Sequence, residues 1–451
     1  ALSAQGRSEL LLEKNWKFTR EDNNEFIKPA FDDSKWQSVT VPHDWAIYGP
    51  FSSLNDKQEV AISQDGQKEA MEHAGRTGGL PFVGVGWYRT EFDVPQFQAG
   101  KRATILFDGA MSHANVYING QKVGYWPYGY NSFHFDITKY LKPGEKNTLA
   151  VRLENLPESS RWYPGAGLYR NVHLIITEDA YIPVWGTYIT TPSVNEKFAK
   201  VNVRTKVVLP EGADPAKYSV ETSVWNPNKQ KLTAVRTSLA QMKYSNNQAE
   251  QEFVIQAPSL WSPEMPALYS AETRLYEGDK LKDIYTTPFG IRSIEIIPDK
   301  GFFLNGKRTV FKGVCNHHDL GPLGAAVNDA AIRRQIRILT DMGCNAIRTS
   351  HNMPAPELIR ACDEMGMMIM AESFDEWNVA KCKNGYNLLF DEWAEKDLVN
   401  LLHNFRNNPS VVMWCIGNEV PNQWNEGDCK IAKWLQDICH REDPTRPVNQ
   451  G

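Results

Sequence analysis

The clearest hydrophobic pattern lies near the end of the chain. Residues 411–416 form an unbroken apolar run, short enough for one strand and without the alternation of a half-exposed strand. Such runs are typical of parallel strands that are buried on both faces. Asn418 and Glu419 follow the run directly, so an amide and a carboxylate stand at its C-terminal end. Taken alone, this pattern fits an ordinary strand end with a solvated glutamate equally well.

Three earlier segments have the same design, and they change that balance. Strand-like segments over residues 311–316, 344–350 and 367–371 each lead into polar side chains. In a β/α barrel the C-terminal ends of the strands form the mouth of the site. Four strands that all end in polar groups therefore predict a functional site. The polar residues after the three earlier strands are His317, His318, Asp319, His351 and Glu372.

Helical patterns separate these strands. Ile332, Ile336 and Leu339 share one face at i, i+4 and i+7 spacing. Gly343 and Gly366 can end the first two helices in the left-handed conformation, and a strand follows each of them at once. This alternation of strand and helix predicts a parallel sheet, which we interpret as part of a (β/α)8 TIM barrel.

The first part of the chain, residues 1–178, has a different pattern, with short strand-like runs between turn residues. Residues 114–118 and 121–126 flank Asn119 and Gly120. Asn-Gly between two strand-like runs is a strong hairpin signal, because both residues tolerate positive φ. Many short strands at regular spacing predict a jelly-roll β-sandwich for this domain.

Two glycine clusters in this region resemble the start of a dinucleotide-binding fingerprint. Residues 84–89 and 165–170 both carry arginine at the sixth position, and neither opens a helical pattern. We therefore interpret them as turns in a β-rich domain and reject a Rossmann fold.

Residues 179–290 remain β-like and show no helical periodicity. Tyr218, Val220, Thr222 and Val224 would share one face of a strand. The span has the size of one immunoglobulin-like β-sandwich. Nothing in it indicates catalysis, and we expect it to act as a spacer before a barrel domain over residues 291–451.

Composition narrows the class of protein. A chain of 451 residues should divide into about three domains. A net charge of -5 gives no reason to expect nucleic acid, whose binding relies on basic surface. No apolar run approaches the ~20 residues of a membrane span. The 7 cysteines all lie at or after Cys315, and their odd count indicates core thiols and not a disulfide framework. Residues 1–5 fit the remainder of a cleaved signal, so we expect a periplasmic or secreted protein and leave a cytoplasmic one open.

Two motifs make the whole chain resemble glycoside hydrolase family 2, which contains β-galactosidases, β-glucuronidases and β-mannosidases. The first covers residues 345–354, with Asn352 where the family usually has tyrosine. The second covers residues 404–410 and leads into Trp414 and the Asn418–Glu419 pair. The resemblance implies the order jelly roll, immunoglobulin-like domain and TIM barrel.

The resemblance also implies roles at the last strand. Glu419 is expected to be the general acid/base, and Asn418 to contact the sugar 2-hydroxyl. A glycosidic oxygen is a poor leaving group, so an acid must protonate it as the bond breaks. Retaining enzymes use a second carboxylate about 5–5.5 Å away, which the family places on the seventh strand. We assign that nucleophile to no residue of this sequence and expect it beyond residue 451.

Further residues are candidates for substrate binding. Adjacent strand residues point to opposite sides, so we expect one histidine of the 317–318 pair to face the sugar. Asp44 either reaches the site or caps its own turn. Arg348 and Glu372 either orient Glu419, contact the substrate or form a structural ion pair. The complete set is Asn418, His351, His317, His318, Asp44, Glu372 and Arg348.

The sugar and the partners are less closely defined. The stretches 317–321 and 162–167 look β-galactosidase-like, although Arg161 and its neighbours stand where galactosidases place an aspartate. We expect hydrolysis of terminal β-D-galactosides; a β-glucuronidase, a β-mannosidase and a non-catalytic carbohydrate-binding protein are the alternatives. No recognised metal-ligand spacing appears, and residues 372–378 lack the histidine of the family's magnesium sites, so we expect no cofactor.

We expect a carbohydrate partner, no nucleic acid and no membrane span, and we leave a homo-oligomer open. The sequence stops where a fifth barrel strand should start, so we expect the first and fourth strands to be open edges. Exposed apolar edges favour aggregation. Residues 1–451 alone are therefore expected to be inactive and poorly behaved.

Overall fold

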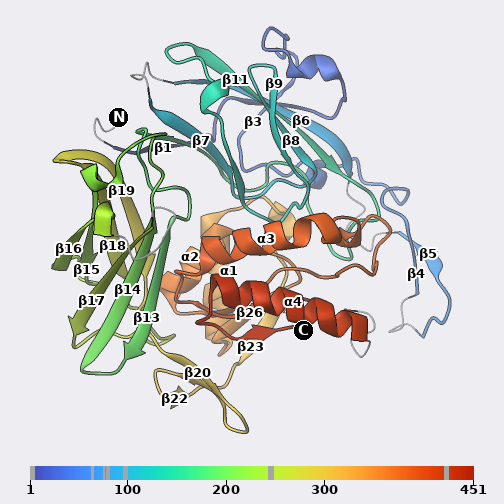
Figure 1. Ribbon diagram of the computed structural model, residues 1–451. Coiled ribbons are helices and arrows are strands. Elements are labelled where there is room, and N and C mark those ends of the chain that lie inside the picture. The colour runs from blue at the N-terminus through green and yellow to red at the C-terminus, as the bar shows by residue number, and fades with distance from the viewer. Residues whose placement is uncertain are drawn as a thin grey trace.

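The computed structural model describes residues 6–61, 66–74, 77, 82–94, 100–241, 248–420 and 426–451. It confirms the predicted fold class, with a jelly-roll sandwich, an immunoglobulin-like sandwich and part of a TIM barrel. Figure 1 shows the first sandwich above the barrel helices and the second sandwich at the side. Short 3-10 helices lie at Asn24–Ile27, Ala46–Tyr48, Thr138–Tyr140, Pro215–Lys217, Leu239–Gln241, Gly321–Leu323 and Tyr386–Leu388.

The jelly roll consists of two antiparallel sheets and a separate pair of short strands. One sheet has the order β1 (Ser8–Leu11), β12 (Val172–Thr177), β7 (Arg102–Phe107) and β10 (Phe133–Asp136). The second has the order β3 (Gln37–Val39), β2 (Trp16–Thr19), β6 (Gly84–Asp93), β11 (Lys146–Asn155), β8 (Ala114–Ile118) and β9 (Gln121–Trp126). The separate pair is β4 (Gln58–Val60) and β5 (Met71–His73).

Local sequence explains this domain well. Asn119 and Gly120 have φ values of 50° and 81°, so the β8–β9 hairpin has the predicted Asn-Gly turn. Between the sheets the Phe133 ring stacks on Phe107, with centroids 5.0 Å apart, and on Trp126 at 5.6 Å. Trp126 thus packs against the jelly-roll core and also lies at the edge of the domain that faces the barrel.

The second domain is a two-sheet sandwich, as its alternation predicts. Its sheets have the orders β13-β14-β17 and β16-β15-β18-β19. Tyr218, Val220, Thr222 and Val224 are all at most 4% exposed, so they share the buried face. The strands are β13 (Thr187–Val194), β14 (Phe198–Lys206), β15 (Tyr218–Trp225), β16 (Lys231–Ser238), β17 (Gln248–Gln256), β18 (Tyr269–Glu277) and β19 (Lys280–Phe289).

The last region contains a parallel sheet with helices between its strands. The sheet order is β23 (Gly313–Asn316), β24 (Ala346–Thr349), β25 (Met368–Glu372), β26 (Val411–Cys415) and β27 (Val448–Asn449). The helices are α1 (Asp329–Asp341), α2 (Pro356–Met365), α3 (Phe390–Phe405) and α4 (Glu426–Glu442). The antiparallel strands β20 (Ile294–Ile297), β21 (Gly301–Leu304) and β22 (Lys307–Arg308) precede them.

One prediction about this sheet needs correction. The two residues of β27 already pair with β26, Val448 opposite Trp414 and Asn449 opposite Cys415. The outer strands of the sheet are therefore β23 and β27, and not the first and fourth strands. The predicted helix ends are confirmed, since Gly343 and Gly366 follow α1 and α2 with φ values of 89° and 78°.

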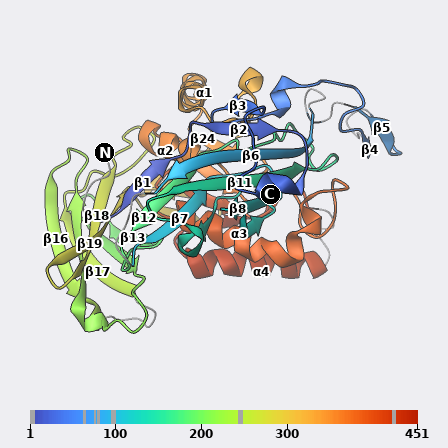
Figure 2. The same ribbon diagram turned by 90° about the horizontal axis from the view of Figure 1, so that it is seen from above.

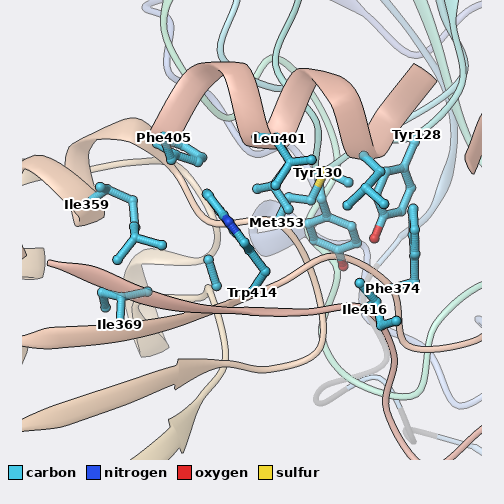
Figure 3. Close-up of a cluster of buried hydrophobic side chains, with 14 of the residues drawn as sticks. Tyr128, Tyr130, Met353, Ile359, Ile369, Phe374, Leu401, Phe405, Trp414 and Ile416 are labelled. Carbon is cyan, nitrogen blue, oxygen red and sulfur yellow. The ribbon is translucent and has the colours of Figure 1, made fainter. Parts of the chain in front are cut away.

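The strand β26 lies in the centre of the barrel core. All five of its residues are buried, and Trp414 is 0% exposed. Figure 3 shows its indole between helix α3, which carries Leu401 and Phe405, and the strand layer. Trp414 Nε1 donates to Asp443 Oδ2 at 2.9 Å. The strand that leads to Glu419 is thus fixed by packing on both faces.

The jelly roll rests on α3 through a buried carboxylate, Asp397, and Figure 2 shows jelly-roll strands lying over this helix. From the jelly roll, Trp126 Nε1 and Asn131 Nδ2 donate to Asp397 Oδ1 at 2.9 Å and 2.8 Å. Tyr386 donates its hydroxyl to Asp397 Oδ2 at 2.5 Å. Burial raises the pKa of Asp397 to about 7, and the three hydrogen bonds only partly oppose this.

Asp397 should make the stability of the domain junction depend on pH. Its pKa is about 7 in the folded protein and 3.8 in a free chain. The folded state therefore binds more protons between these values, and the stability contributed by Asp397 is lost as pH rises through 7. Relative to D397N, the free energy of unfolding should fall by roughly 3 kcal/mol between pH 5 and pH 8.

Urea unfolding at several pH values measures this difference. Asparagine retains an acceptor for Trp126 and Asn131, so D397N should fold. D391N makes the same change at an exposed position of α3. It serves as the matched control and should not reproduce the change expected for D397N between pH 5 and pH 8. If the free energies of unfolding of D397N and the unmodified protein differ by the same amount at every pH, the prediction is wrong.

Candidate active site

A buried ion-pair network lies where β24 and β25 end. Glu372 is the last residue of β25, and its side chain is 0% exposed. Arg348 Nε lies 2.5 Å from Glu372 Oε2 in an ion contact without hydrogen-bond alignment. His351 Nδ1 lies 2.9 Å from Glu372 Oε1. Burial raises the pKa of Glu372, and His351 and Arg348 act against that rise. Glu372 therefore orients two neighbours and presents no exposed surface to a substrate.

Asn418 is held from two sides after β26. It is 2% exposed. Its Oδ1 accepts a hydrogen bond from Arg348 Nη2 at 3.2 Å, and its Nδ2 donates to Asp375 Oδ1 at 2.8 Å. The amide predicted at this strand end is thus part of the same network as Glu372.

Glu419 is exposed, in contrast to the residues before it. Its φ of 41° lies in the left-handed region, which costs a non-glycine residue on the order of 1 kcal/mol or more. Such strain persists only where surrounding structure holds it, and it is concentrated at functional sites. The turn brings an accessible carboxylate to the C-terminal end of a buried strand.

Aromatic and imidazole rings form a wall beside Glu372. Trp162, on a jelly-roll loop, lies with its ring centroid 5.3 Å from His317 and 5.9 Å from His351. The two histidine rings are 5.8 Å apart and perpendicular. Burial lowers the pKa of His317, with the neighbouring His351 adding to the effect. The structure therefore brings His317 and His351 together with the network of Arg348, Glu372 and Asn418.

The contacts of His318 lie on the jelly-roll side. Its Nε2 lies 3.0 Å from the Pro164 carbonyl, and its ring packs against Tyr130 and Tyr169 at 5.0 Å and 5.9 Å. Burial lowers its pKa to about 3. His318 packs the barrel against the jelly roll, while His317 lies beside Trp162 and His351.

Asp44 has structural partners that include the turn-capping contact left open from the sequence. It is 1% exposed, and burial raises its pKa. Its Oδ1 accepts from the backbone of Ala46 and Ala166, and its Oδ2 accepts from the Tyr163 hydroxyl and the backbone of Ala325. These four donors occupy the carboxylate, which thereby joins the jelly-roll loops to the loop after β23.

The sequence analysis missed a second charged cluster, formed by Asp375, Lys381 and Arg161. Arg161 Nε donates to Asp375 Oδ2 at 2.9 Å, and Lys381 Nζ donates to the Asp375 carbonyl at 2.7 Å. Lys381 Nζ also donates to the backbone oxygen of Asn418. Asp375 and Lys381 lie in an irregular loop without periodicity, so the sequence contained no signal for them. Arg161 was noted only because an aspartate was expected there.

A cavity of about 80 Å³ lies beside this cluster. Jelly-roll residues and barrel residues both line it, including Tyr128, Trp162, His351, Asp375 and Tyr386. Within the described ranges, no three His, Cys, Asp or Glu side chains are grouped so that they could hold a metal. No helix in the described part of the chain is long and apolar enough to cross a membrane.

Named relatives share this architecture. The chain is 43% identical over 413 residues to β-galactosidase BoGH2A of Bacteroides ovatus, covering 91% of this chain and 46% of the relative. It is 36% identical over 447 residues to a putative β-glucuronidase of Formosa agariphila, covering 99% and 40%. The crystal structure of a glycosyl hydrolase family 2 member from Bacteroides cellulosilyticus matches with a TM-score of 0.89 at 35% identity, covering 98% of this chain and 56% of that one.

The chain thus spans about half the length of the curated relatives it matches. Three domain models of one family match consecutive segments of the chain. The sugar binding domain of glycosyl hydrolases family 2 matches residues 11–178, a model described as glycosyl hydrolases family 2 matches residues 181–292, and the TIM barrel domain of the family matches residues 295–450. With the same three domains present in the structure, the chain belongs to glycoside hydrolase family 2.

Proposed function

We propose that the full-length protein is a retaining β-glycosidase that hydrolyses terminal β-D-galactosides, with Glu419 as general acid/base. The exposed Glu419 carboxylate at the end of a rigid, buried strand carries this proposal. The fixed amide of Asn418 beside it would contact the sugar. The nucleophile would be a second carboxylate outside residues 1–451, in keeping with the greater length of the relatives.

The geometry suits a carboxyl group that first donates a proton to the glycosidic oxygen and then accepts one from water. Protonation of the glycosidic oxygen needs a carboxyl group with access to the leaving group, and Glu419 is the exposed group of the strand end. Glu372 cannot take this role, because it is enclosed by Arg348 and His351. In a retaining mechanism the same acid later accepts a proton from the attacking water.

Galactose is the favoured sugar because β-galactosidase BoGH2A is the more similar of the two named relatives above, at 43% identity. The second candidate is a β-glucuronidase. The charges of Arg161 and Lys381 beside Asp375 favour it, because a cationic group suits a sugar carboxylate. The putative β-glucuronidase of Formosa agariphila matches over 99% of this chain.

A panel of aryl β-glycosides distinguishes these candidates. The full-length protein should hydrolyse the galactoside with a kcat/KM at least about tenfold above those for the glucuronide and the mannoside, a difference of about 1.4 kcal/mol. The product should retain the anomeric configuration by NMR. A preference for the glucuronide would overturn the galactoside assignment. Sugar binding without any hydrolysis would support a carbohydrate-binding protein.

Replacement of Glu419 tests its role. E419Q should lose roughly 10²–10⁴-fold in kcat/KM on alkyl galactosides, whose leaving groups need protonation. The loss of glycosylation rate should be much smaller on dinitrophenyl galactosides, whose leaving groups depart as anions. E211Q makes the same change at an exposed turn of the second domain and should have no effect. Equal losses on both substrate types would show that Glu419 is not the acid.

A further inference from the structure

The orientation of the Asn418 amide follows from its two charged neighbours. An arginine side chain only donates hydrogen bonds, whereas an ionised carboxylate only accepts them. Asn418 Oδ1 faces Arg348 Nη2 at 3.2 Å, and its Nδ2 faces Asp375 Oδ1 at 2.8 Å. A flipped amide would place its NH₂ group against the guanidinium and its oxygen against the carboxylate. The pair therefore selects one orientation, and among the described residues the second N–H has no hydrogen-bond partner.

Asp375 is the point where three separate segments meet. It follows β25, it receives Asn418 from the loop after β26, and it binds Arg161 from the jelly roll. Lys381 binds the Asp375 carboxylate at 3.2 Å and also the Asn418 carbonyl. Thus both the side chain and the backbone of Asn418 depend on this cluster, directly before the left-handed turn at Glu419.

The cluster also accounts for the charge of Asp375. Its side chain is 13% exposed, and that of Arg161 is 22% exposed. Burial by itself would raise the pKa of Asp375, but Arg161, Lys381 and Asn418 hold the pKa below its ordinary value. Asp375 is therefore an anion at neutral pH, as the selection of the amide orientation requires.

We propose that Asp375 is a positioning residue, which orients the Asn418 amide toward the substrate and is itself held by Arg161 of the jelly roll and by Lys381. This inference rests on the proposed function, in which Asn418 contacts the 2-hydroxyl of the sugar. Asp375 acts through Asn418 and not on the reacting atoms. The jelly roll thus contributes to recognition of the sugar through an ion pair.

The full-length D375N protein tests this assignment. An asparagine at this position can donate or accept, so it no longer selects one amide orientation. The kcat/KM for the aryl galactoside should fall roughly 10- to 100-fold, the size expected for a hydrogen bond to a charged group. For the 2-deoxy analogue, which has no 2-hydroxyl, the loss should stay below about threefold.

Two comparisons separate positioning from simple damage to the structure. D375N should add nothing in an N418A background, because both changes remove the same contact. D391N, the same change on an exposed turn of α3, should have no effect. If D375N does not fold, R161Q replaces it, since Arg161 is partly exposed and should show the same selective loss at smaller size. Equal losses on both sugars, or independent effects of D375N and N418A, would overturn the proposal.

Failure of the proposed function would look different. If the unmodified enzyme hydrolyses none of the glycosides in the panel, that function is wrong. Calorimetric titration with methyl β-galactoside and its 2-deoxy analogue then decides on Asp375. If the unmodified protein binds the two ligands with different affinities and D375N binds them with equal affinities, the positioning role is supported. Unchanged discrimination, or no binding of either ligand, refutes it.

Discussion

The arrangement of the site depends on the cost of burying the Glu372 carboxylate at the end of β25. A charge without water must be compensated by an opposite charge and by hydrogen bonds. Arg348 and His351 provide this compensation, and both come from the neighbouring strand end. Because Arg348 Nε is held at Glu372, its Nη2 has a fixed position from which it binds Asn418. One desolvated carboxylate thus determines the orientation of side chains on three consecutive strands.

The jelly roll is part of the site and not an appendage. It supplies Trp162 to the ring wall and Arg161 to the Asp375 cluster. Arg170, fully buried, donates to the carbonyls of Met353 and Pro354 in the loop after β24. These contacts hold the loop that carries His351. A barrel loop is normally mobile, and its attachment to a second domain limits the geometries that it can adopt.

The sequence predicted most of the elements, because their signals are local. The buried run of β26, the Asn-Gly hairpin of β8 and β9 and the glycines after α1 and α2 each depend on neighbouring residues only. The roles of His318 and Asp44 depend on partners more than 100 residues away, Pro164 for the first and Ala325 for the second. Asp375 and Lys381 lie in a loop without periodicity, and their importance arises from Arg161 of another domain. Residue type alone could not predict such pairings.

Asp375 and Asp397 show that the same interface tunes two buried carboxylates in opposite directions. Asp397 receives hydrogen bonds only from the neutral donors Trp126, Asn131 and Tyr386, and burial prevails, so its pKa rises to about 7. Asp375 is nearly as enclosed, but Arg161 and Lys381 keep its pKa below the ordinary value. The difference follows from the partners, because two nearby cations favour the charged form of Asp375 more than three neutral hydrogen-bond donors favour that of Asp397. The interface therefore has an anion beside the strand ends and, on α3, a carboxyl group whose pKa is raised.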